Sequence, residues 1–276
     1  MAIVLSLEEI QKQSLEVLSQ FDEICTKNGF KYWLTYGTLI GAIRHNGFIP
    51  WDDDIDVMMP RDDFNRFIEF AQENERSLYP LKLHNRANTK NYWYGIPRFS
   101  NMNYKYIVED KYEKQFDIGV FIDIYPLDNF GNTIEDAKRI FNKCRFFNRK
   151  YDWYINSISQ GGFFRSLAKS ILHIIVRFKE GANYSQRIDQ EIVEYICQNT
   201  SNSDEFLGMI AFAGKIVRYD KRIVGDIDIV RHDFSGKQFN IPKEYDYILR
   251  QSFGDYMILP PEGERHPTHN YRVEIR

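Results

Sequence analysis

The residues best suited to chemistry in this 276-residue chain lie in one stretch, YGTLIGAIRHNGFIPWDDDIDVMM, from Tyr36 to Met59. Its acidic end contains the step Asp54-Ile55-Asp56. Side chains alternate faces along a strand, so both carboxylates would lie on one face, with their Cα atoms about 7 Å apart. Carboxylates at this spacing can hold one hard divalent cation or share two. The pattern therefore predicts a metal site for phosphoryl chemistry.

A second acidic segment, QFDIGVFIDIYPLD at 115–128, offers a third ligand. Its alternating apolar residues indicate a strand with Asp123 near the end, just before Pro126. If this strand pairs with the Asp-Ile-Asp strand, Asp123 faces the same cation. Asp117 lies six residues earlier, about 20 Å away along a strand, so we expect it to stay outside the cluster.

Two structural alternatives compete with the metal site. The first is a solvated acidic turn, but Trp51 and Ile55 lie beside and within the run, and a plain surface loop rarely carries such apolar material. The second is an EF-hand calcium loop starting at Asp52. That loop needs Gly at its sixth position and normally Glu at its twelfth, where this chain has Val57 and Asp63. Clustered carboxylates beside a buried strand need a compensating cation, which favours the metal site.

The Gly37-Thr38 pair ahead of the carboxylates is expected to begin a helix that binds phosphate. Glycine lets the backbone approach a phosphate closely, and a helix start presents free N–H groups and the positive end of the helix dipole. A strand-like segment at 32–36 precedes the pair. Arg44 follows near the end of the helix and is a candidate phosphate contact, with structural pairing as the equal alternative.

The C-terminal segment FGDYMILPPEGERHPTHNY is a second candidate wall of the site. Its prolines and glycines exclude a regular helix, and loops on rigid scaffolds often carry specificity. The alternative is a polar tail with no role. The candidate substrate contacts outside the metal cluster are Arg265, His266, His269 and Trp51, the last because it adjoins the carboxylates.

These segments together resemble the LicD family of phosphotransferases, which includes the fukutin-related enzymes. The resemblance rests on YGTLIGAIRHNGFIPWDDDIDV, FIDIYPLD and the C-terminal motif, and covers about 32–128 and about 234–271. It implies a nucleotidyltransferase-type fold. By that resemblance the glycine turn is Gly37 and Thr38, the paired metal ligands are Asp54 and Asp56, and the third carboxylate is Asp123.

The resemblance also implies a reaction. Phosphocholine, or a related phospho-alcohol, would pass from CDP-choline or a similar CDP-linked donor to a sugar hydroxyl of a cell-surface glycan or teichoic acid precursor, releasing CMP. The acceptor would be a lipid-linked glycan. One or two Mg²⁺ ions, with Mn²⁺ as an alternative, would bridge the donor phosphates, and Asp123 would take the acceptor proton or hold the metal. Aromatic faces recognise quaternary ammonium, although the 18 Tyr and 4 Trp alone do not indicate choline.

Three other functions stay open at this point. A ribitol-phosphate or glycerol-phosphate transferase could use the same scaffold, and no residue excludes it. A nucleotidyltransferase would attack the α-phosphorus of a nucleoside triphosphate and release pyrophosphate. A non-catalytic metal-binding or glycan-binding module would use the acidic cluster only to order a loop.

The elements around these motifs predict an α+β fold: a nucleotidyltransferase-like mixed sheet with flanking helices and a helical insertion. The catalytic lobe is expected at 1–130, a mainly helical region at 131–232, and a segment returning to the site at 233–276. A capping box at Ser6 and Glu9 begins an N-terminal helix, and another helix follows Pro60. Strands at 81–84, 92–99 and 104–108 are expected to extend the catalytic sheet.

The amino-acid composition excludes several other classes of protein. The chain is 43% hydrophobic, enough for a substantial core. A net charge of -3 argues against a nucleic-acid binder, which would carry a basic excess. Cys25, Cys144 and Cys197 are far apart and odd in number, so no disulfide framework is expected. With no recognisable secretory signal at the N-terminus, we expect a cytoplasmic protein, in part at the inner face of the cell membrane.

One helical segment, FFRSLAKSILHIIVRFK at 163–179, combines apolar and basic residues. It is too short and too basic to span a bilayer. A strong apolar face with basic residues suits a helix lying on an anionic membrane surface, so peripheral membrane contact is expected here. The alternative is a core helix whose cations reach out to solvent.

Overall fold

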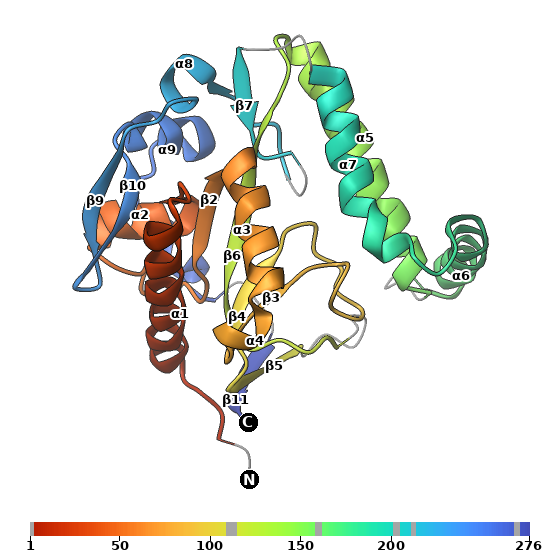
Figure 1. The fold of residues 1–276 in the computed structure, drawn as a ribbon, viewed down its shortest axis with the longest axis horizontal. Coiled ribbons are helices and arrows are strands. Elements are labelled where there is room, and N and C mark those ends of the chain that lie inside the picture. The colour runs from red at the N-terminus through yellow and green to blue at the C-terminus, as the bar shows by residue number, and fades with distance from the viewer. Residues whose placement is uncertain (1–2, 109–114, 158–161, 201–204, 211–213, 268–270) are drawn as a thin grey trace.

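The computed structural model describes residues 3–108, 115–157, 162–200, 205–210, 214–267 and 271–276. It shows a curled mixed sheet with helices packed on it, and a group of helices to one side (Figure 1). This confirms the expected α+β architecture. The main sheet has the order β1-β2-β6-β4-β3, with β7 and β8 joined to the end of β6. Its strands are β1 (Trp33–Leu34), β2 (Asp56–Pro60), β3 (Leu81–His84), β4 (Arg98–Asn101), β6 (Val120–Asn129), β7 (Phe206–Gly208) and β8 (Tyr219–Asp220).

The first helix begins at the expected capping box of Ser6 and Glu9. Thr133 and Asp136 form a second capping box, which was not predicted, at the start of α5 (Ile134–Ile155). The helices are α1 (Leu7–Asn28), α2 (Tyr36–His45), α3 (Arg61–Glu73), α4 (Glu75–Leu78), α5 (Ile134–Ile155), α6 (Gly162–Glu180), α7 (Tyr184–Thr200), α8 (Lys221–Val224) and α9 (Tyr245–Phe253), with a short 3-10 turn at Glu262–Glu264.

The side chains of β2 and β6 alternate between the two faces of the sheet, and this decides which residues pack in the core and which face the candidate site. Val57 of β2 and Ile122 of β6 are fully buried in the main core, together with Phe21 of α1 and Phe67 of α3. The two phenylalanine rings meet edge to face, with centroids 5.0 Å apart. Because successive side chains point to opposite faces, the residues between these apolar positions project from the other side of the sheet.

Two expectations about the strands are wrong in part. Of the 92–99 segment only Arg98 and Phe99 lie in a strand, β4, which continues to Asn101, because Pro97 has no N–H to donate and Tyr92 packs instead in a separate aromatic cluster with Phe116. β5 (Tyr104–Val108) forms where expected but does not join the catalytic sheet. It pairs antiparallel with β11 (Tyr271–Ile275) in a small sheet of its own.

The C-terminal part returns to the first part of the chain. The hairpin of β9 (Ile229–Phe234) and β10 (Lys237–Pro242) lies at one edge of the molecule, next to α2 (Figure 1). Phe234, Phe239 and Leu249 are buried in the same core as α1 and β2. The C-terminal residues thereby build the wall of the catalytic lobe.

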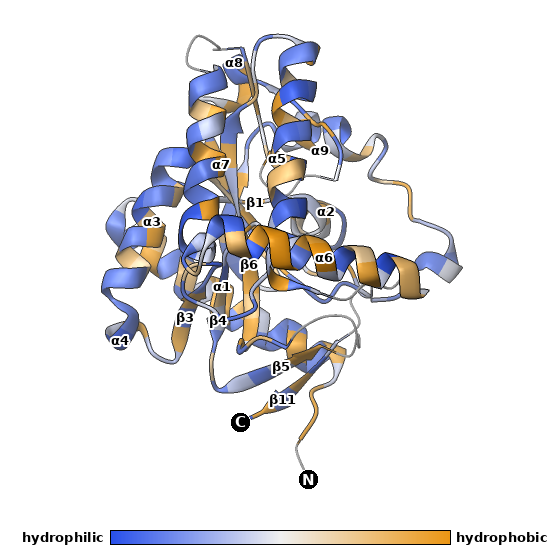
Figure 2. Cartoon of the chain, turned by 90° about the vertical axis from the view of Figure 1, so that its right-hand side faces the viewer, coloured by the Kyte–Doolittle hydropathy of each residue, from blue (hydrophilic) through white to orange (hydrophobic). Residues whose placement is uncertain are grey.

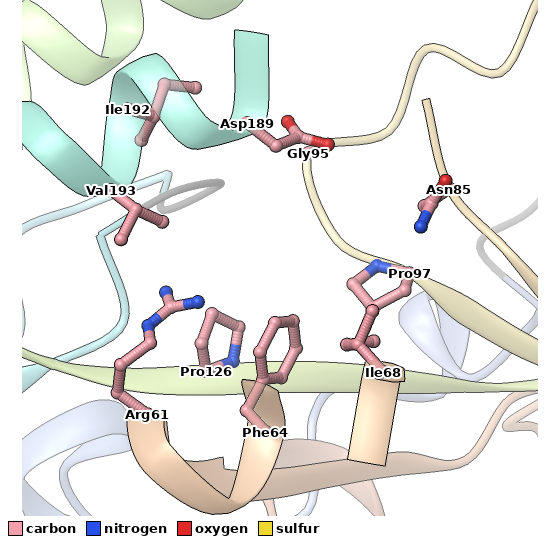
Figure 3. Close-up of a pocket in the computed structure, with 10 residues that line it drawn as sticks. All are labelled: Arg61, Phe64, Ile68, Asn85, Gly95, Pro97, Pro126, Asp189, Ile192 and Val193. Atoms are coloured by element: carbon pink, nitrogen blue, oxygen red, sulfur yellow. The ribbon is translucent and has the colours of Figure 1, made fainter. Parts of the chain in front are cut away.

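The helical region has its own core, formed where α5 and α7 pack together, and it lies beside the sheet. A cavity of about 120 Å³ separates α7 from α3 and β6 (Figure 3). Its wall includes Pro126, which is three residues beyond Asp123 and therefore on the opposite face of β6. Arg61 at its edge is held by both carboxylate oxygens of Asp128, each at 2.6 Å. This cavity is thus separate from the carboxylate cluster described next.

Candidate active site

The predicted carboxylates converge. β2 and β6 run parallel, and Asp56 is directly paired with Asp123 across the two strands. Asp54 lies two residues before the start of β2. One carboxylate oxygen from each of Asp54, Asp56 and Asp123 lies within 4.8 Å of the others. Acidic groups from two distant segments of chain therefore meet at one point, as their spacing predicts.

The buried position of this cluster makes its negative charge costly. Asp56 and Asp123 are 7% and 4% exposed. Burial, followed by the charges of Asp54, Asp123 and Asp52, raises the pKa of Asp56 well above its ordinary value. One oxygen of Asp56, Oδ1, has no hydrogen-bond partner among the described residues. An all-oxygen donor set with an unpaired buried carboxylate oxygen fits a hard divalent cation.

A neighbouring acidic group, Asp52 and Asp53, was not among the predicted metal ligands. Asp52, Asp53 and Asp54 each offer an oxygen within 4.8 Å of the others. The prediction took only Asp54 and Asp56 from the acidic run, on the assumption that both lie in one strand, but β2 begins only at Asp56, so the alternation rule does not apply to the loop before it. The run of three aspartates was itself the available signal.

The glycine turn lies against this acidic loop. A Cβ added at Gly37 would lie 2.8 Å from Asp52 Oδ2, so only glycine fits at this position without displacing that carboxylate. The side chain of Asp52 thus approaches the start of α2, where a negative charge is favoured by the helix dipole. Gly37 therefore allows the close approach of the Asp52 carboxylate, and its role in binding phosphate stays a prediction.

Thr38 fixes the position of Asp56. Its hydroxyl oxygen accepts a hydrogen bond from the backbone N–H of Asp56 at 2.8 Å, and both residues are buried. α2 begins at Tyr36, two residues earlier than expected. Tyr36 has a φ of 47°, a left-handed conformation that is strained for a bulky residue and is often found at functional sites.

Arg98 is a site residue that no sequence signal indicated. Its Nε donates to Asp123 Oδ1 at 2.7 Å, from the position on β4 directly paired with Asp123. Its guanidinium lies between the rings of Tyr94 and Phe121, 3.8 and 3.9 Å from their centroids. Burial opposes its charge, but Asp123 and the neighbouring tyrosines raise the pKa of Arg98 well above its ordinary value. Arg98 therefore balances one negative charge of the cluster and fixes the orientation of Asp123.

An aromatic cavity of about 600 Å³ adjoins the carboxylates. Tyr125 connects the two, because its side chain hydrogen-bonds to Asp56 and its ring meets that of Tyr36 edge to face at 5.0 Å. Burial and the charge of Asp56 raise the pKa of Tyr125, so its hydroxyl keeps its proton. The remaining wall carries Tyr219 and Phe253 and one cation, Lys215.

The candidate contacts outside the cluster lie in different surroundings. Arg44 Nη1 donates to the carbonyl of Tyr256 at 2.6 Å, so it connects α2 with the C-terminal segment. Arg265 lies 5.8 Å from the ring of Trp51, which brings the C-terminal loop next to the acidic run. His266 is exposed. The roles of Arg44, Trp51, Arg265 and His266 in substrate binding stay predictions, and His269 lies outside the described residues.

Tyr271 marks the return of the C-terminal segment to the acidic loop. Its hydroxyl donates to the carbonyl oxygen of Asp53 at 3.0 Å. Burial and the charges of Asp53 and Asp54 raise its pKa above the ordinary tyrosine value, so the donor proton is retained. The sequence-based candidates in this segment were Arg265, His266 and His269. Tyr271, the last residue of the C-terminal motif, was not among them, because a single tyrosine carries no distinguishing pattern.

Comparison with known proteins identifies the same region. Residues 29–159 match the family described as LicD/FKTN/FKRP, nucleotidyltransferase domain. Over 274 residues the chain is 28% identical to the lipopolysaccharide cholinephosphotransferase LicD of Haemophilus influenzae, covering 96% of each chain. A stretch of 82 residues is 39% identical to an uncharacterised protein of Rickettsia typhi, covering 30% of this chain and 24% of that protein. A stretch of 29 residues is 55% identical to the ribitol 5-phosphate transferase FKRP of mouse and human, covering 10% of this chain and 6% of theirs.

The matched region and the site coincide. The glycine turn, the acidic loop, Arg98 and Asp123 all fall within 29–159. The similarity to the Haemophilus protein extends well beyond this domain, through the helical region and the C-terminal wall. Residues 29–159 of this chain are therefore a nucleotidyltransferase domain of the LicD/FKTN/FKRP family, and the chain is similar to a LicD phosphotransferase over nearly its whole length.

Proposed function

We propose that this protein transfers phosphocholine, or a related phospho-alcohol, from a CDP-linked donor to a sugar hydroxyl of a cell-surface glycan or teichoic acid precursor, and releases CMP. The observation that carries the proposal is the convergence of Asp54, Asp56 and Asp123, with one oxygen of each within 4.8 Å of the others. The similarity to a lipopolysaccharide cholinephosphotransferase over nearly the whole chain supports phosphocholine as the transferred group and CDP-choline as its donor.

Asp54, Asp56 and Asp123 would hold Mg²⁺, with Mn²⁺ as the alternative. When bound, the cation supplies charge neutralisation for the donor pyrophosphate during in-line displacement. The protein side chains have distinct tasks. Thr38 holds the backbone of Asp56, and Arg98 holds Asp123 Oδ1. The second contact, from Arg98 Nη2 to Asp123 Oδ2, is longer, at 3.4 Å, and therefore weaker. Oδ2 takes the proton of the attacking hydroxyl. The sugar oxygen bonds to the distal phosphorus, and the bond to CMP breaks.

The aromatic cavity beside the cluster would take the organic part of the donor. Its wall of tyrosine and phenylalanine rings supports a choline headgroup, since quaternary ammonium is attracted to aromatic faces. Lys215 lies in the same wall, 5.7 Å from the ring of Phe253, and offers a positive charge for a donor phosphate. The acceptor is a lipid-linked glycan, which the protein meets from the cytoplasmic side of the membrane. The three free thiols, Cys25, Cys144 and Cys197, are consistent with a reducing compartment.

The central experiment measures CMP release from CDP-choline, CDP-ribitol and CDP-glycerol, with and without Mg²⁺. We expect release that depends on Mg²⁺ and is fastest with CDP-choline. Because hydrolysis can be slow when no acceptor is present, thermal stabilisation by each donor is measured in parallel. The 29-residue similarity to ribitol 5-phosphate transferases makes CDP-ribitol the second candidate donor. Pyrophosphate release from a nucleoside triphosphate, without CMP release from any CDP donor, would instead identify a nucleotidyltransferase.

Asp123→Asn separates catalysis from binding. A catalyst should lose turnover by orders of magnitude while keeping its folded spectrum, whereas a non-catalytic metal-binding or glycan-binding module would keep its ligand. Asp117→Asn is the matched control. That carboxylate lies on the same segment but bonds to Arg276 at the surface, so its replacement should leave turnover unchanged.

A further inference from the structure

Helix α6 presents its apolar side to solvent. The exposed residues include Phe164 at 83% and Phe178 at 91%, and they recur along one face of the helix. Figure 2 shows α6 lying across the face of the molecule turned to the viewer, with much of its length coloured as hydrophobic. Val176 is the single buried residue that α6 contributes to the helical core. The large exposed apolar side chains of this face are Phe163, Phe164, Leu167, Ile171, Ile174, Ile175 and Phe178.

The opposite side of α6 attaches the helix to the protein through polar groups. Lys169 pairs with Asp152 of α5 at 2.9 Å. His173 Nδ1 lies 2.9 Å from the carbonyl oxygen of Trp153, and Ser170 donates to the carbonyl of Ser157 at 2.8 Å. A helix of a soluble protein normally buries its apolar side and exposes its polar side. In α6 this arrangement is reversed, so another apolar surface, from a protein or a membrane interface, is needed to cover the exposed face.

The positive charge of α6 indicates what kind of surface covers its apolar face. The helix has four lysine and arginine residues, and its one acidic residue, Glu180 at the C-terminal end, is paired with Lys150 and Arg187, although the whole chain has a net charge of -3. Arg165, Arg177 and Lys179 are exposed at its two ends. A second copy of the chain would bring the same cations against one another. An anionic surface satisfies both the apolar face and the basic ends.

We infer that α6 is a docking helix that lies flat on an anionic lipid surface, with its apolar face in the boundary between headgroups and acyl chains. Its 19 residues extend about 28 Å, at about 1.5 Å per residue. Among the described residues, no helix is apolar and long enough to cross a bilayer. The inference rests on α6 alone and does not depend on which donor the enzyme uses.

The test uses full-length protein and vesicles of phosphatidylcholine with or without phosphatidylglycerol, read by flotation. We expect binding to the anionic vesicles that weakens with added salt. The triple variant Phe164→Ser, Ile171→Ser, Phe178→Ser should abolish it. Arg165→Gln with Lys179→Gln should lower the partition coefficient about fivefold for each charge, as expected from about 1 kcal/mol per basic residue.

Ile3→Ser is the matched control, because Ile3 is 63% exposed but lies outside α6. It should bind as the unchanged protein does. Since the replaced residues of α6 are exposed, the variants should keep the same unfolding midpoint, which circular dichroism verifies. Equal binding of the triple variant and the unchanged protein would overturn the inference, as would equal binding to neutral vesicles. Self-association that the triple variant loses, without any vesicle binding, would show that a second copy covers α6 instead.

Discussion

Arg98 and Asp123 occupy directly opposed positions on β4 and β6 and form a buried ion pair, with Nε 2.7 Å from Oδ1 and side-chain exposures of 3% and 5%. Two charges removed from water in this way stabilise a fold only while both are present. The pair also lies at the border of the carboxylate cluster, so one guanidinium serves both stability and the orientation of a site residue.

Replacement of Arg98 by methionine should destabilise the metal-free protein by about 3–5 kcal/mol, because Asp123 would remain buried without its partner. Urea unfolding in the presence of a chelator measures this. Added Mg²⁺ should restore part of the loss, since a cation can replace the missing charge. Arg66→Met is the control: its pair with Asp63 is exposed, so the expected cost is below about 1 kcal/mol. Equal costs for the two variants would contradict the buried-pair interpretation.

Gly37→Ala should damage the site without damaging the fold. The new methyl group would lie 2.8 Å from Asp52 Oδ2 and force that carboxylate away from the start of α2. Alanine is a better helix former than glycine by about 1 kcal/mol, so the unfolding midpoint should hold or rise slightly. Turnover and divalent-cation affinity should fall. Gly263→Ala, at a position with no atom within 4 Å of the added Cβ, should change neither.

The convergence of Asp56 and Asp123 was predictable because a local rule covers it. The period of two fixes which residues of β2 and β6 are apolar, and these two aspartates take the other face, whereas Asp54 joins them from the loop two residues before β2. Only the pairing of the two strands had to be assumed, and it is parallel with Asp56 opposite Asp123.

Arg98 was not predictable, because a strand was expected at 92–99 in the catalytic sheet but its register was not, and it is the register with β6 that places Arg98 opposite Asp123. The reversal of α6 has a similar origin. Periodicity shows that the helix has an apolar face, but it cannot show which way that face points. That direction is set by tertiary contacts such as Lys169 with Asp152.

Thr38→Val should weaken the support of Asp56. Valine has nearly the same shape as threonine but cannot accept the hydrogen bond from the Asp56 N–H, which would then be buried without a partner at a cost of about 1–3 kcal/mol. Divalent-cation affinity, measured by calorimetry, should fall together with stability. Thr38→Ser keeps the hydroxyl and should retain most of both. Wild-type cation affinity in the valine variant would show that Thr38 does not position Asp56.

His84 should make the stability of this protein sensitive to mild acid. It is 1% exposed on β3, and burial, helped by the charge of Lys82, lowers its pKa from 6.5 to about 4. The unfolded chain therefore binds more protons than the folded chain between these values. The free energy of unfolding rises with pH through this window, and the stabilisation, at most about 3 kcal/mol, is complete above 6.5 and is lost as pH falls toward 4.

Urea unfolding across this pH range measures how steeply the free energy of unfolding rises with pH. His84→Gln removes the titrating group and should flatten the slope relative to the unchanged protein, while His266→Gln, at an exposed position, should leave it as it was. An identical pH dependence in the unchanged protein and in His84→Gln would mean that other groups set the acid sensitivity. Because both variants are compared at the same metal concentration, the titration of the carboxylate cluster cancels in the difference.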